Sequence, residues 1–458
     1  MRNHSFKLGV CPIGKVLFDH EDTLRQKREI YRKLDELGIE YVTIEDAVTD
    51  GVIRTMDQVL PAVRSLQAQG ASALFIPHCN FGTEGAAGQI AHELSLPTLL
   101  WAPRDEAPLE DGSRRRDSLC GCFATGRVLK LLNVQFDYIE NCAVDDPPFV
   151  QGIDRFIRAC RGVNALKKAR VGMLGVRVPF FWCTINDEAS MLKRFGGGVQ
   201  TFDMVEFIQA VDQMRTKNET TYRAELADMR WLDHSNIPEE GLLRSLAMRD
   251  VMLRLADEYK IDAFAVQFFD SLQEHIGPGA GLGLALVENQ MPCSAETDVT
   301  GAFSSVLMEG IAGSTSFFPE YVIRHPEDDN QVCLWHASAP LELRHPDSNP
   351  VRIQEPWILK GSPATSLQFY LQEGPVTLGR FDGIGEDFAL GFGEGESVVG
   401  PKTREVYSWL KVKDWPEWEK RMLRGGFIHH CSAVYGHYAD ALALAADFLN
   451  VPAIRFND

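Results

Sequence analysis

The side chains best able to do chemistry lie in short segments that are otherwise apolar. They are Glu296, Asp298, Glu320, His336, His429 and His430. A carboxylate in apolar surroundings must be paired or bound to a metal ion if it is buried, because isolated burial is very costly. Two carboxylates and two histidines form a donor set that suits Mn²⁺ or a similar divalent ion. These residue types therefore predict a metal site, provided that the fold brings them together.

Each of these residues also has a purely structural explanation. Asp298 falls in the first turn of a predicted helix, where an acidic side chain interacts favourably with the helix dipole. A single histidine at a strand end, such as His336, is more often a structural residue than a metal ligand. Adjacent strand residues point to opposite faces, so at most one of His429 and His430 is expected to face a given site. The sequence pattern leaves both explanations open.

The first third of the chain alternates apolar strand-like runs with amphipathic helical spacing. Strands are predicted at residues 6–11, 40–44, 73–76, 98–101 and 136–140, with helices at 22–37 and 56–69 between the first three. Strands that alternate with helices indicate βαβ units and a parallel sheet. The strand-then-glycine pattern starts again at residues 169–175, followed by a helix at 238–260 and a strand at 263–267.

The pattern changes from about residue 313 onward. Short β-like runs separated by Gly, Pro and Asp predict an antiparallel sheet or barrel, and a helix is expected at 438–449. The predicted fold is therefore α/β. Two flavodoxin-like parallel-sheet domains, residues 1–165 and 166–312, precede a β-rich domain at 313–458.

Composition narrows the classes of function. The chain has 64 acidic and 46 basic residues among 458, which argues against a nucleic-acid-binding protein. No apolar run approaches the roughly 20 residues needed to cross a bilayer, and the start of the chain lacks a signal-peptide pattern. Ten scattered cysteines are typical of reduced thiols in a cytoplasmic protein. The dense basic run 114–116 is either a solvated turn or a contact for an acidic substrate.

Several segments, taken in order, resemble the L-fucose isomerase and L-arabinose isomerase superfamily. The family's first domain is resembled by Leu8–Pro12 and Pro77–Glu84. Its two-carboxylate signature is resembled by Ala295–Asp298 followed by Ser316–Glu320, and the histidine segment of the arabinose branch is resembled by Leu334–His336. The C-terminal end of the family is resembled by His429–Cys431, Tyr435–His437 and Val451–Ile454. The resemblance extends over nearly the whole chain.

The resemblance implies a bound ion, Mn²⁺ or else Co²⁺ or Mg²⁺. Its ligands would be Glu296, Glu320 and His430, with His336 as the ligand of the arabinose-type site. Glu296 and Glu320 would also be the catalytic residues. Sugar contacts are expected from Gln267, Asn80, Trp335 and His429. Gln267 also suits a plain loop or helix-capping role, and Glu320 stands where fucose isomerases have Asp.

By the same resemblance, the protein would be a metal-dependent isomerase that interconverts an aldose and a ketose by enediolate-type proton transfer between C1 and C2. A homo-oligomer, trimer or hexamer, is implied as well. Cys11 and Cys79–Asn80 replace an arginine and an aromatic residue of fucose isomerases, so a sugar other than fucose is expected, and the arginines at 114–116 leave room for an anionic one. The alternatives are a non-catalytic sugar-binding or regulatory protein, and a metal-dependent aldolase or epimerase on the same scaffold.

Overall fold

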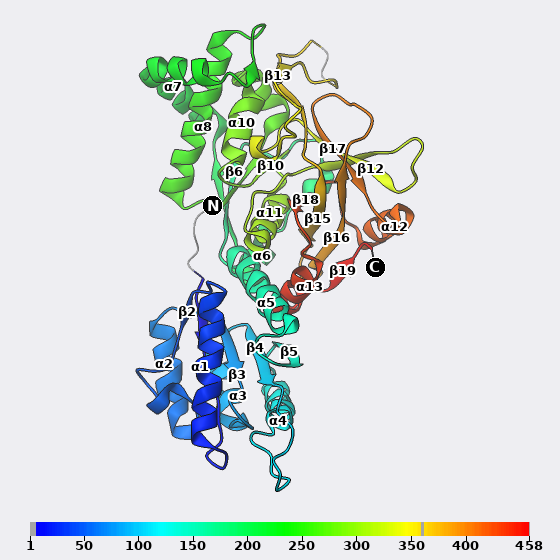
Figure 1. Ribbon diagram of the computed structural model, residues 1–458. Helices are drawn as coiled ribbons and strands as arrows, with labels where there is room; N and C mark the ends of the chain where they lie inside the picture. The colour runs from blue at the N-terminus through cyan, green and yellow to red at the C-terminus, as the bar shows by residue number, and fades with distance from the viewer. Residues whose placement is uncertain (1–5, 359–360, 458) are drawn as a thin grey trace. The chain divides into compact units, whose positions relative to one another are not determined.

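The computed structural model describes residues 6–358 and 361–457 (Figure 1). The chain divides into two compact units, Asn3–Asn164 and Ala165–Asp458. Among the described residues, no helix combines the length and the apolar character needed to cross a membrane.

The N-terminal unit is built on a five-stranded parallel sheet in the order β2-β1-β3-β4-β5. The strands are β1 (Leu8–Val10), β2 (Tyr41–Val42), β3 (Ala73–Pro77), β4 (Thr98–Pro103) and β5 (Phe136–Cys142). Every residue of β3 and β4 is buried, as their continuous apolar runs predict for central parallel strands. The strand order is that of flavodoxin-like folds.

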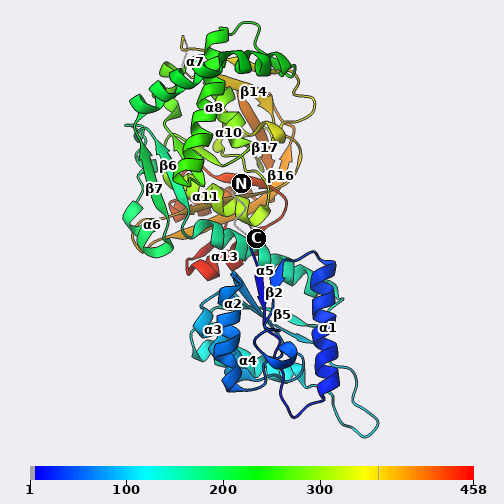
Figure 2. The same ribbon diagram turned by 90° about the vertical axis from the view of Figure 1, so that its left-hand side faces the viewer.

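Helices cover both faces of this sheet. They are α1 (His20–Glu36), α2 (Val59–Ala68), α3 (Glu84–Leu94), α4 (Ser118–Leu131) and α5 (Pro147–Leu166), with 3₁₀ turns at Thr49–Gly51 and Met56–Gln58. Figure 2 shows α1 on one side of the sheet, and α2 and α3 on the other. Helix α1 begins where the Asp19 carboxylate accepts a hydrogen bond from Asp22 N–H, and it buries Ile30 and Leu34 on one face.

The second unit contains a four-stranded parallel sheet in the order β10-β9-β6-β7. Its strands are β6 (Arg170–Leu174), β7 (Gly198–Phe202), β9 (Ala263–Val266) and β10 (Cys293–Ala295). The connecting helices are α6 (Glu188–Phe195), α7 (Met204–Asp228), α8 (Glu239–Tyr259), α9 (Gln273–His275), α10 (Ala280–Glu288) and α11 (Val299–Ala312), with a 3₁₀ turn at Trp182–Thr184 and a π-helical turn at Phe268–Leu272. The order again follows the flavodoxin-like pattern, with one strand fewer.

A ten-stranded mixed sheet completes the second unit, with the central order β18-β15-β16-β17-β14-β13-β8. Its strands are β8 (Leu232–Asp233), β11 (Glu320–Arg324), β12 (Gln331–His336), β13 (Val351–Gln354), β14 (Ser366–Tyr370), β15 (Gly374–Asp382), β16 (Ala389–Val398), β17 (Val406–Lys411), β18 (Ser432–Tyr435) and β19 (Ala453–Arg455). A 3₁₀ turn (Leu341–Leu343) and the helices α12 (Trp415–Gly425) and α13 (Ala439–Leu449) lie within this part.

The predicted fold class, two parallel-sheet α/β parts followed by a β-rich part, is confirmed. The last sheet is not purely antiparallel, because β8 pairs parallel with β13, β14 with β17, and β16 with β19. Since β8 comes from residues 232–233, one strand of the mixed sheet lies before residue 312 in the chain. The division of the chain at 312 stays a prediction.

Helix α11 joins the two sheets of the second unit. It contacts β6, β9 and β10 of the parallel sheet and β15 and β18 of the mixed sheet (Figure 1). Nearly all of its residues are buried, as expected for a helix packed between two sheets. Its N-terminus therefore lies at the edge where β9 and β10 end, which is where open α/β sheets bind ligands.

Candidate active site

Four side chains from distant parts of the sequence converge in the second unit. Glu296, Glu320, His336 and His430 each offer one ligand atom, and these four atoms all lie within 4.8 Å of one another. His430 is completely buried, and Glu296 and His336 are only 7% and 5% exposed. These are the four residues predicted as metal ligands from the sequence. Their geometry fits that prediction, and their binding of an ion stays a prediction.

A strained turn positions Glu296 at the carboxyl end of β10. Glu296 and the next residue, Thr297, have positive φ angles of 59° and 51°, which costs a non-glycine residue about 1 to 3 kcal/mol. Thr297 secures the turn, since its N–H donates to Val266 O (3.0 Å) and its hydroxyl to Val176 O (3.1 Å). The ends of β6 and β9 thus hold the Glu296 carboxylate beside the start of α11.

Backbone pairing positions Glu320 and His430. Glu320 opens β11 and is paired with Trp335 of β12 on one side and with His430 on the other. Cys431 N–H donates to Pro319 O (3.0 Å), and Tyr321 N–H donates to His429 O (3.1 Å). The register of these segments therefore fixes Glu320 next to both predicted histidine ligands.

Asp298 orients the ring of His430. The Nδ1 of His430 lies 3.0 Å from Asp298 Oδ2, and its Nε2 lies 3.3 Å from Glu296 Oε2 and 3.4 Å from Glu320 Oε1. Arg380, itself buried, donates to both oxygens of Asp298 at 2.5 and 3.1 Å. A carboxylate that accepts from Nδ1 leaves Nε2 as the nitrogen available to a metal ion, as in the carboxylate–histidine–metal triads of many metal sites.

The pKa values of these groups follow from burial and pairing. Burial alone would lower the pKa of His430, but the carboxylates of Asp298, Glu296 and Glu320 raise it well above the ordinary value. Burial favours the neutral form of Asp298, yet the Arg380 guanidinium holds the pKa of that carboxyl far below its usual range. Burial raises the pKa of Glu296, whereas His430 and the other histidines outweigh burial at Glu320 and lower its pKa. Without a metal ion, the neighbouring carboxylates therefore favour the protonated form of His430.

His336 differs from the other three residues. Its Nδ1 accepts a hydrogen bond from Ala337 N–H (2.8 Å), and burial lowers its pKa to about 4. A neutral His336 with this contact carries its proton on Nε2, which is buried and has no hydrogen-bond partner among the described residues. In this arrangement the ring presents an N–H donor, and Nε2 becomes a metal ligand only when the Ala337 contact is given up.

The cluster fits a divalent transition-metal ion. Glu296 Oε2 is buried and has no hydrogen-bond partner in the described chain, because its contact with His430 lacks hydrogen-bond geometry. Unsatisfied buried polar atoms are rare in proteins and are typical of sites that bind an ion or water or have another functional role. Imidazole together with carboxylate suits Mn²⁺ or Co²⁺ better than Mg²⁺, which prefers oxygen ligands alone.

A cavity of about 260 Å³ opens onto this cluster, close to the lower end of the about 300 to 1,000 Å³ of small-molecule sites. Trp335 and His429, both predicted sugar contacts, line it together with Phe180 and Phe181. His429 Nε2 is 3.9 Å from Glu320 Oε1, so His429 and His430 both approach Glu320. The expectation that only one of them faces the site was wrong, because the pair precedes β18 in an irregular segment where strand alternation does not apply.

The other two predicted sugar contacts are engaged elsewhere. Gln267 accepts a hydrogen bond from Val176 N–H (3.0 Å) and is not among the residues that line the cavity. Asn80, in the N-terminal unit, accepts from Lys15 N–H (2.8 Å) and donates to the Thr23 hydroxyl (2.9 Å). Both amides hold loops in place, and their contact with a sugar stays a prediction.

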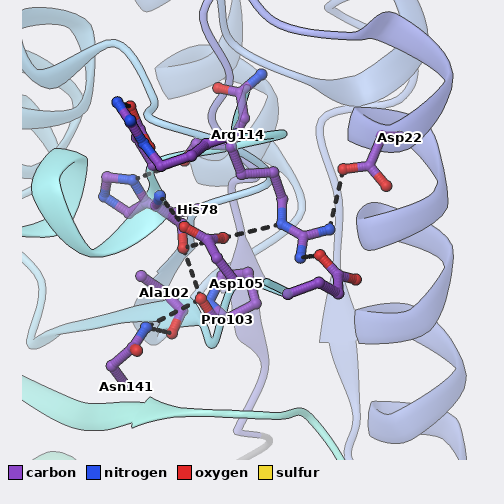
Figure 3. A network of polar contacts seen from close by, with 12 residues as sticks. Asp22, His78, Ala102, Pro103, Asp105, Arg114 and Asn141 are labelled. Carbon is purple, nitrogen blue, oxygen red and sulfur yellow. Dashed lines mark hydrogen bonds and ion pairs between the residues drawn. The ribbon is translucent and has the colours of Figure 1, made fainter. Parts of the chain in front are cut away.

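The basic run at 114–116 is largely neutralised by acidic neighbours. Arg116 is 1% exposed and pairs with Asp22 and Asp105 at 3.0 Å and with Glu106. Figure 3 shows this network, in which Asn141 also donates to the carbonyl oxygens of Ala102 and Pro103. Arg114 pairs with Asp117. Arg114 and Arg116 therefore form ion pairs inside the N-terminal unit, and the pair of Arg116 with Asp22 connects its loop to α1.

Some contacts and residues of the site were not predicted from the sequence. Asp298 does cap α11, through Gly301 N–H at 2.8 Å, but its pairing with His430 and Arg380 was not foreseen. The only available signal was a lone arginine inside the apolar run of β15. Gln273, Ser366 and Glu405 also line the cavity and were not predicted, since nothing near them in the sequence marks them.

Comparison with known proteins shows which proteins this chain resembles. The family model described as the N-terminal domain of fucose/sulfoquinovose isomerase matches residues 9–167. A sulfoquinovose isomerase of Clostridium sp. (strain MSTE9) is 24% identical, with 98% of each chain covered. One from Priestia megaterium is 20% identical and covers 96% of this chain and 97% of its own.

These matches support a place for the chain in the fucose isomerase-like family. The resemblance inferred from the sequence motifs is thereby confirmed. Among solved structures, a periplasmic sugar binding protein from Legionella pneumophila aligns with 66% of this chain and 94% of its own at 11% identity and a TM-score of 0.16, which is too low to relate the two folds.

Proposed function

We propose that this protein is a metal-dependent aldose–ketose isomerase that acts on a monosaccharide bearing an anionic group. The observation that carries the proposal is the buried cluster of Glu296, Glu320, His336 and His430, which borders a cavity of sugar-like size. The anionic substituent is suggested by the relatives, which are named for sulfoquinovose, a sulfonated sugar.

The metal ligands would be Glu296, Glu320 and His430, with Mn²⁺ as the ion. A bound divalent cation would polarise the substrate carbonyl and stabilise the negative charge that develops on the sugar oxygens. Asp298 would keep His430 in the tautomer that presents Nε2. His336 would be either a fourth ligand or, in the tautomer described above, a hydrogen-bond donor to a sugar oxygen.

The two glutamates would carry out the proton transfers. An aldose becomes a ketose when the C2 proton moves to C1 and the O2 proton moves to O1. One carboxylate takes the C2 proton and returns it to C1, while the other carries the hydroxyl proton between the two oxygens. Phe180, Phe181 and Trp335 in the cavity wall exclude water, which protects the carbanion-like intermediate from stray protonation.

We also propose where the enzyme is located, how it assembles and how its chain is divided into domains. We expect a cytoplasmic homo-oligomer, a trimer or hexamer, and three domains at 1–165, 166–312 and 313–458. Size-exclusion chromatography with light scattering measures the oligomeric state directly.

An isomerase assay in deuterated water tests the proposed function. Purified protein is stripped with a chelator, reloaded with Mn²⁺, and incubated with neutral and anionic aldoses and ketoses, sulfoquinovose included. We expect activity only in the reloaded protein. Solvent deuterium at C1 of the ketose, without carbon–carbon cleavage, supports isomerisation and excludes an aldolase.

Three outcomes contradict the proposal. Interconversion of two aldoses without ketose indicates an epimerase, and cleavage products indicate an aldolase. Sugar binding by metal-free protein, with no turnover of any sugar after reloading, supports a non-catalytic sugar-binding protein. Glu309→Gln serves as the matched control, because Glu309 is a buried carboxyl on α11 that hydrogen-bonds Ser316 and does not line the cavity.

A further inference from the structure

A second group of polar side chains lines the same cavity and takes no part in the metal cluster. Gln273 opens α9, Ser366 opens β14, and Glu405 immediately precedes β17. Their exposed fractions are 4%, 0% and 0%. Each has an atom without a hydrogen-bond partner among the residues that the structure describes: Gln273 Oε1, Ser366 Oγ and Glu405 Oε2.

The backbone around Glu405 is built to hold its carboxyl group in the cavity wall. Glu405 has a φ angle of 71°, a left-handed conformation that is unfavourable for a residue with a Cβ atom. Gln368 secures it, because its side chain accepts from Glu405 N–H (2.9 Å) and donates to Glu405 O (2.9 Å). One carboxyl oxygen accepts from Trp357 N–H (2.9 Å), which leaves Oε2 for another partner.

Strand pairing places Ser366 and Glu405 near each other and near the metal cluster. Strands β14 and β17 pair in parallel, and Val406, the residue after Glu405, is paired with His336 of β12. The Ser366 hydroxyl lies close enough to the Glu405 carboxyl to oppose the rise of its pKa, although the two are not in hydrogen-bond geometry. A ligand oxygen between them would give both groups a partner.

We infer that Gln273, Ser366 and Glu405 form a subsite that binds hydroxyl groups of the sugar and excludes an anionic substituent. This inference rests on the proposed sugar substrate. An amide oxygen, a hydroxyl and a carboxyl together accept and donate hydrogen bonds, which matches the hydroxyl groups of a sugar. No lysine or arginine is among the described residues that line the cavity, so a sulfonate or phosphate in this subsite would have no cation to offset its charge.

Binding of unreactive sugar alcohols tests the subsite without requiring catalysis. Calorimetry of the full-length, Mn²⁺-loaded protein uses glucitol, mannitol and galactitol, together with glucitol 6-phosphate as the anionic probe. Ser366→Ala and Gln273→Leu remove one hydrogen-bonding group each, and we expect each to weaken binding of the hexitols about 2- to 10-fold. Glu309→Gln, the buried carboxyl outside the cavity, should leave the affinities unchanged.

Glu405→Gln tests the exclusion of the anion. If the subsite holds only hydroxyl groups, Glu405→Gln changes the affinities for the neutral and the phosphorylated probes by the same factor. The ratio of the two affinities then stays as in the wild-type protein. Tighter binding of glucitol 6-phosphate by Glu405→Gln alone would overturn the inference, because it would place the anion against Glu405. Unchanged hexitol affinity in both Ser366→Ala and Gln273→Leu, or no hexitol binding by the wild-type protein, would also overturn it.

The subsite and the isomerase activity fail separately. If hexitol binding follows the expected pattern but no sugar is isomerised, the proposed activity is wrong and the subsite stands. If a sugar is isomerised and the three substitutions leave its KM unchanged, the activity stands and the subsite is wrong. For a true substrate, Ser366→Ala is expected to raise KM with little change in kcat, since the subsite lies outside the reacting carbons.

Discussion

At the scale of single residues, the two cluster glutamates carry the sharpest prediction. Glu296→Gln keeps the side-chain size but removes a negative charge and a base, so turnover should fall about 100- to 10,000-fold. Glu320→Gln should behave alike, and the double variant should be little worse than either single one, because the two residues act as a unit. The measurement is kcat/KM on the sugar found by the substrate panel. Retained turnover in Glu296→Gln would refute the mechanism.

The same substitutions should not weaken the metal-free fold. Glu296 and Glu320 are two carboxylates held within 4.8 Å in a buried site, and like charges at that separation repel. Thermal melting after chelation should therefore show an unchanged or higher transition temperature for Glu296→Gln. A clear loss of stability would mean that Glu296 is chiefly structural.

Asp298 is the residue whose loss should affect both metal binding and stability. Asp298→Asn keeps the helix cap, since asparagine caps as well as aspartate, but it removes the partner of Arg380 and His430. Breaking a buried ion pair costs about 3 to 5 kcal/mol, and loss of an orienting carboxylate lowers metal affinity about 10- to 100-fold. Urea unfolding and Mn²⁺ titration measure the two effects. Unchanged Mn²⁺ affinity would show that Asp298 does not orient His430.

At the scale of elements, the sequence predicts the helices and strands that are determined by the pattern of neighbouring residues. Strand β3 is a continuous apolar run, and α8 has regular apolar spacing, so both lie close to their predicted positions. Strand β8, two residues long, exists because Leu232 and Asp233 pair with β13 more than 100 residues later, and no local pattern encodes that pairing. Helix α12 was not predicted, although Asp414 caps it and Gly426 ends it.

The same distinction separates the predictable from the unpredictable part of the site. Glu296, Glu320, His336 and His430 stand out as polar residues in apolar segments with family-like motifs. Glu405 has no such motif, and its position in the cavity depends on Gln368, Trp357 and the pairing of β17. The position of Glu405 in the cavity therefore depends on pairing between segments that are distant in the sequence.

An element-scale prediction concerns pH. Glu288 ends α10, where burial raises its pKa to about 8 against an opposing hydrogen bond from Ser338. The folded protein then holds a proton that the unfolded chain releases, so the free energy of unfolding falls as pH rises from about 4.5 to about 8. Glu288→Gln removes this dependence. The free energy of unfolding of the variant, relative to that of the wild type, should therefore increase by several kcal/mol between pH 5 and pH 8, with about 5 kcal/mol as the upper bound.

Urea unfolding at these two pH values checks the prediction. Glu110→Gln, on the exposed loop before α4, is the control and should leave the difference between the two pH values unchanged. An equal difference in Glu288→Gln and the wild type would show that the Glu288 carboxyl is ionised in the folded protein.

At the scale of the whole molecule, the cluster connects two sheets of one unit. Glu296 follows β10 of the parallel sheet, whereas Glu320, His336 and His430 belong to β11, β12 and the segment before β18 in the mixed-sheet part. An ion held by these residues would cross-link two parts of the chain that also contact each other through α11. All four ligands lie within Ala165–Asp458, and none lies in the N-terminal unit.

Metal binding should therefore stabilise one unit selectively. A ligand that binds only the folded state adds about 2.7 kcal/mol of stability at 100 times its Kd, and this gain belongs to the unit that contains the site. We expect hydrogen–deuterium exchange in α11, β11, β12 and β18 to slow when Mn²⁺ replaces a chelator, while exchange in residues 6–164 stays the same. His430→Ala is the control and should abolish the difference, because it removes the ligand that Asp298 orients. Equal protection of both units in the wild type would mean that Mn²⁺ binds elsewhere or acts through assembly of the protein.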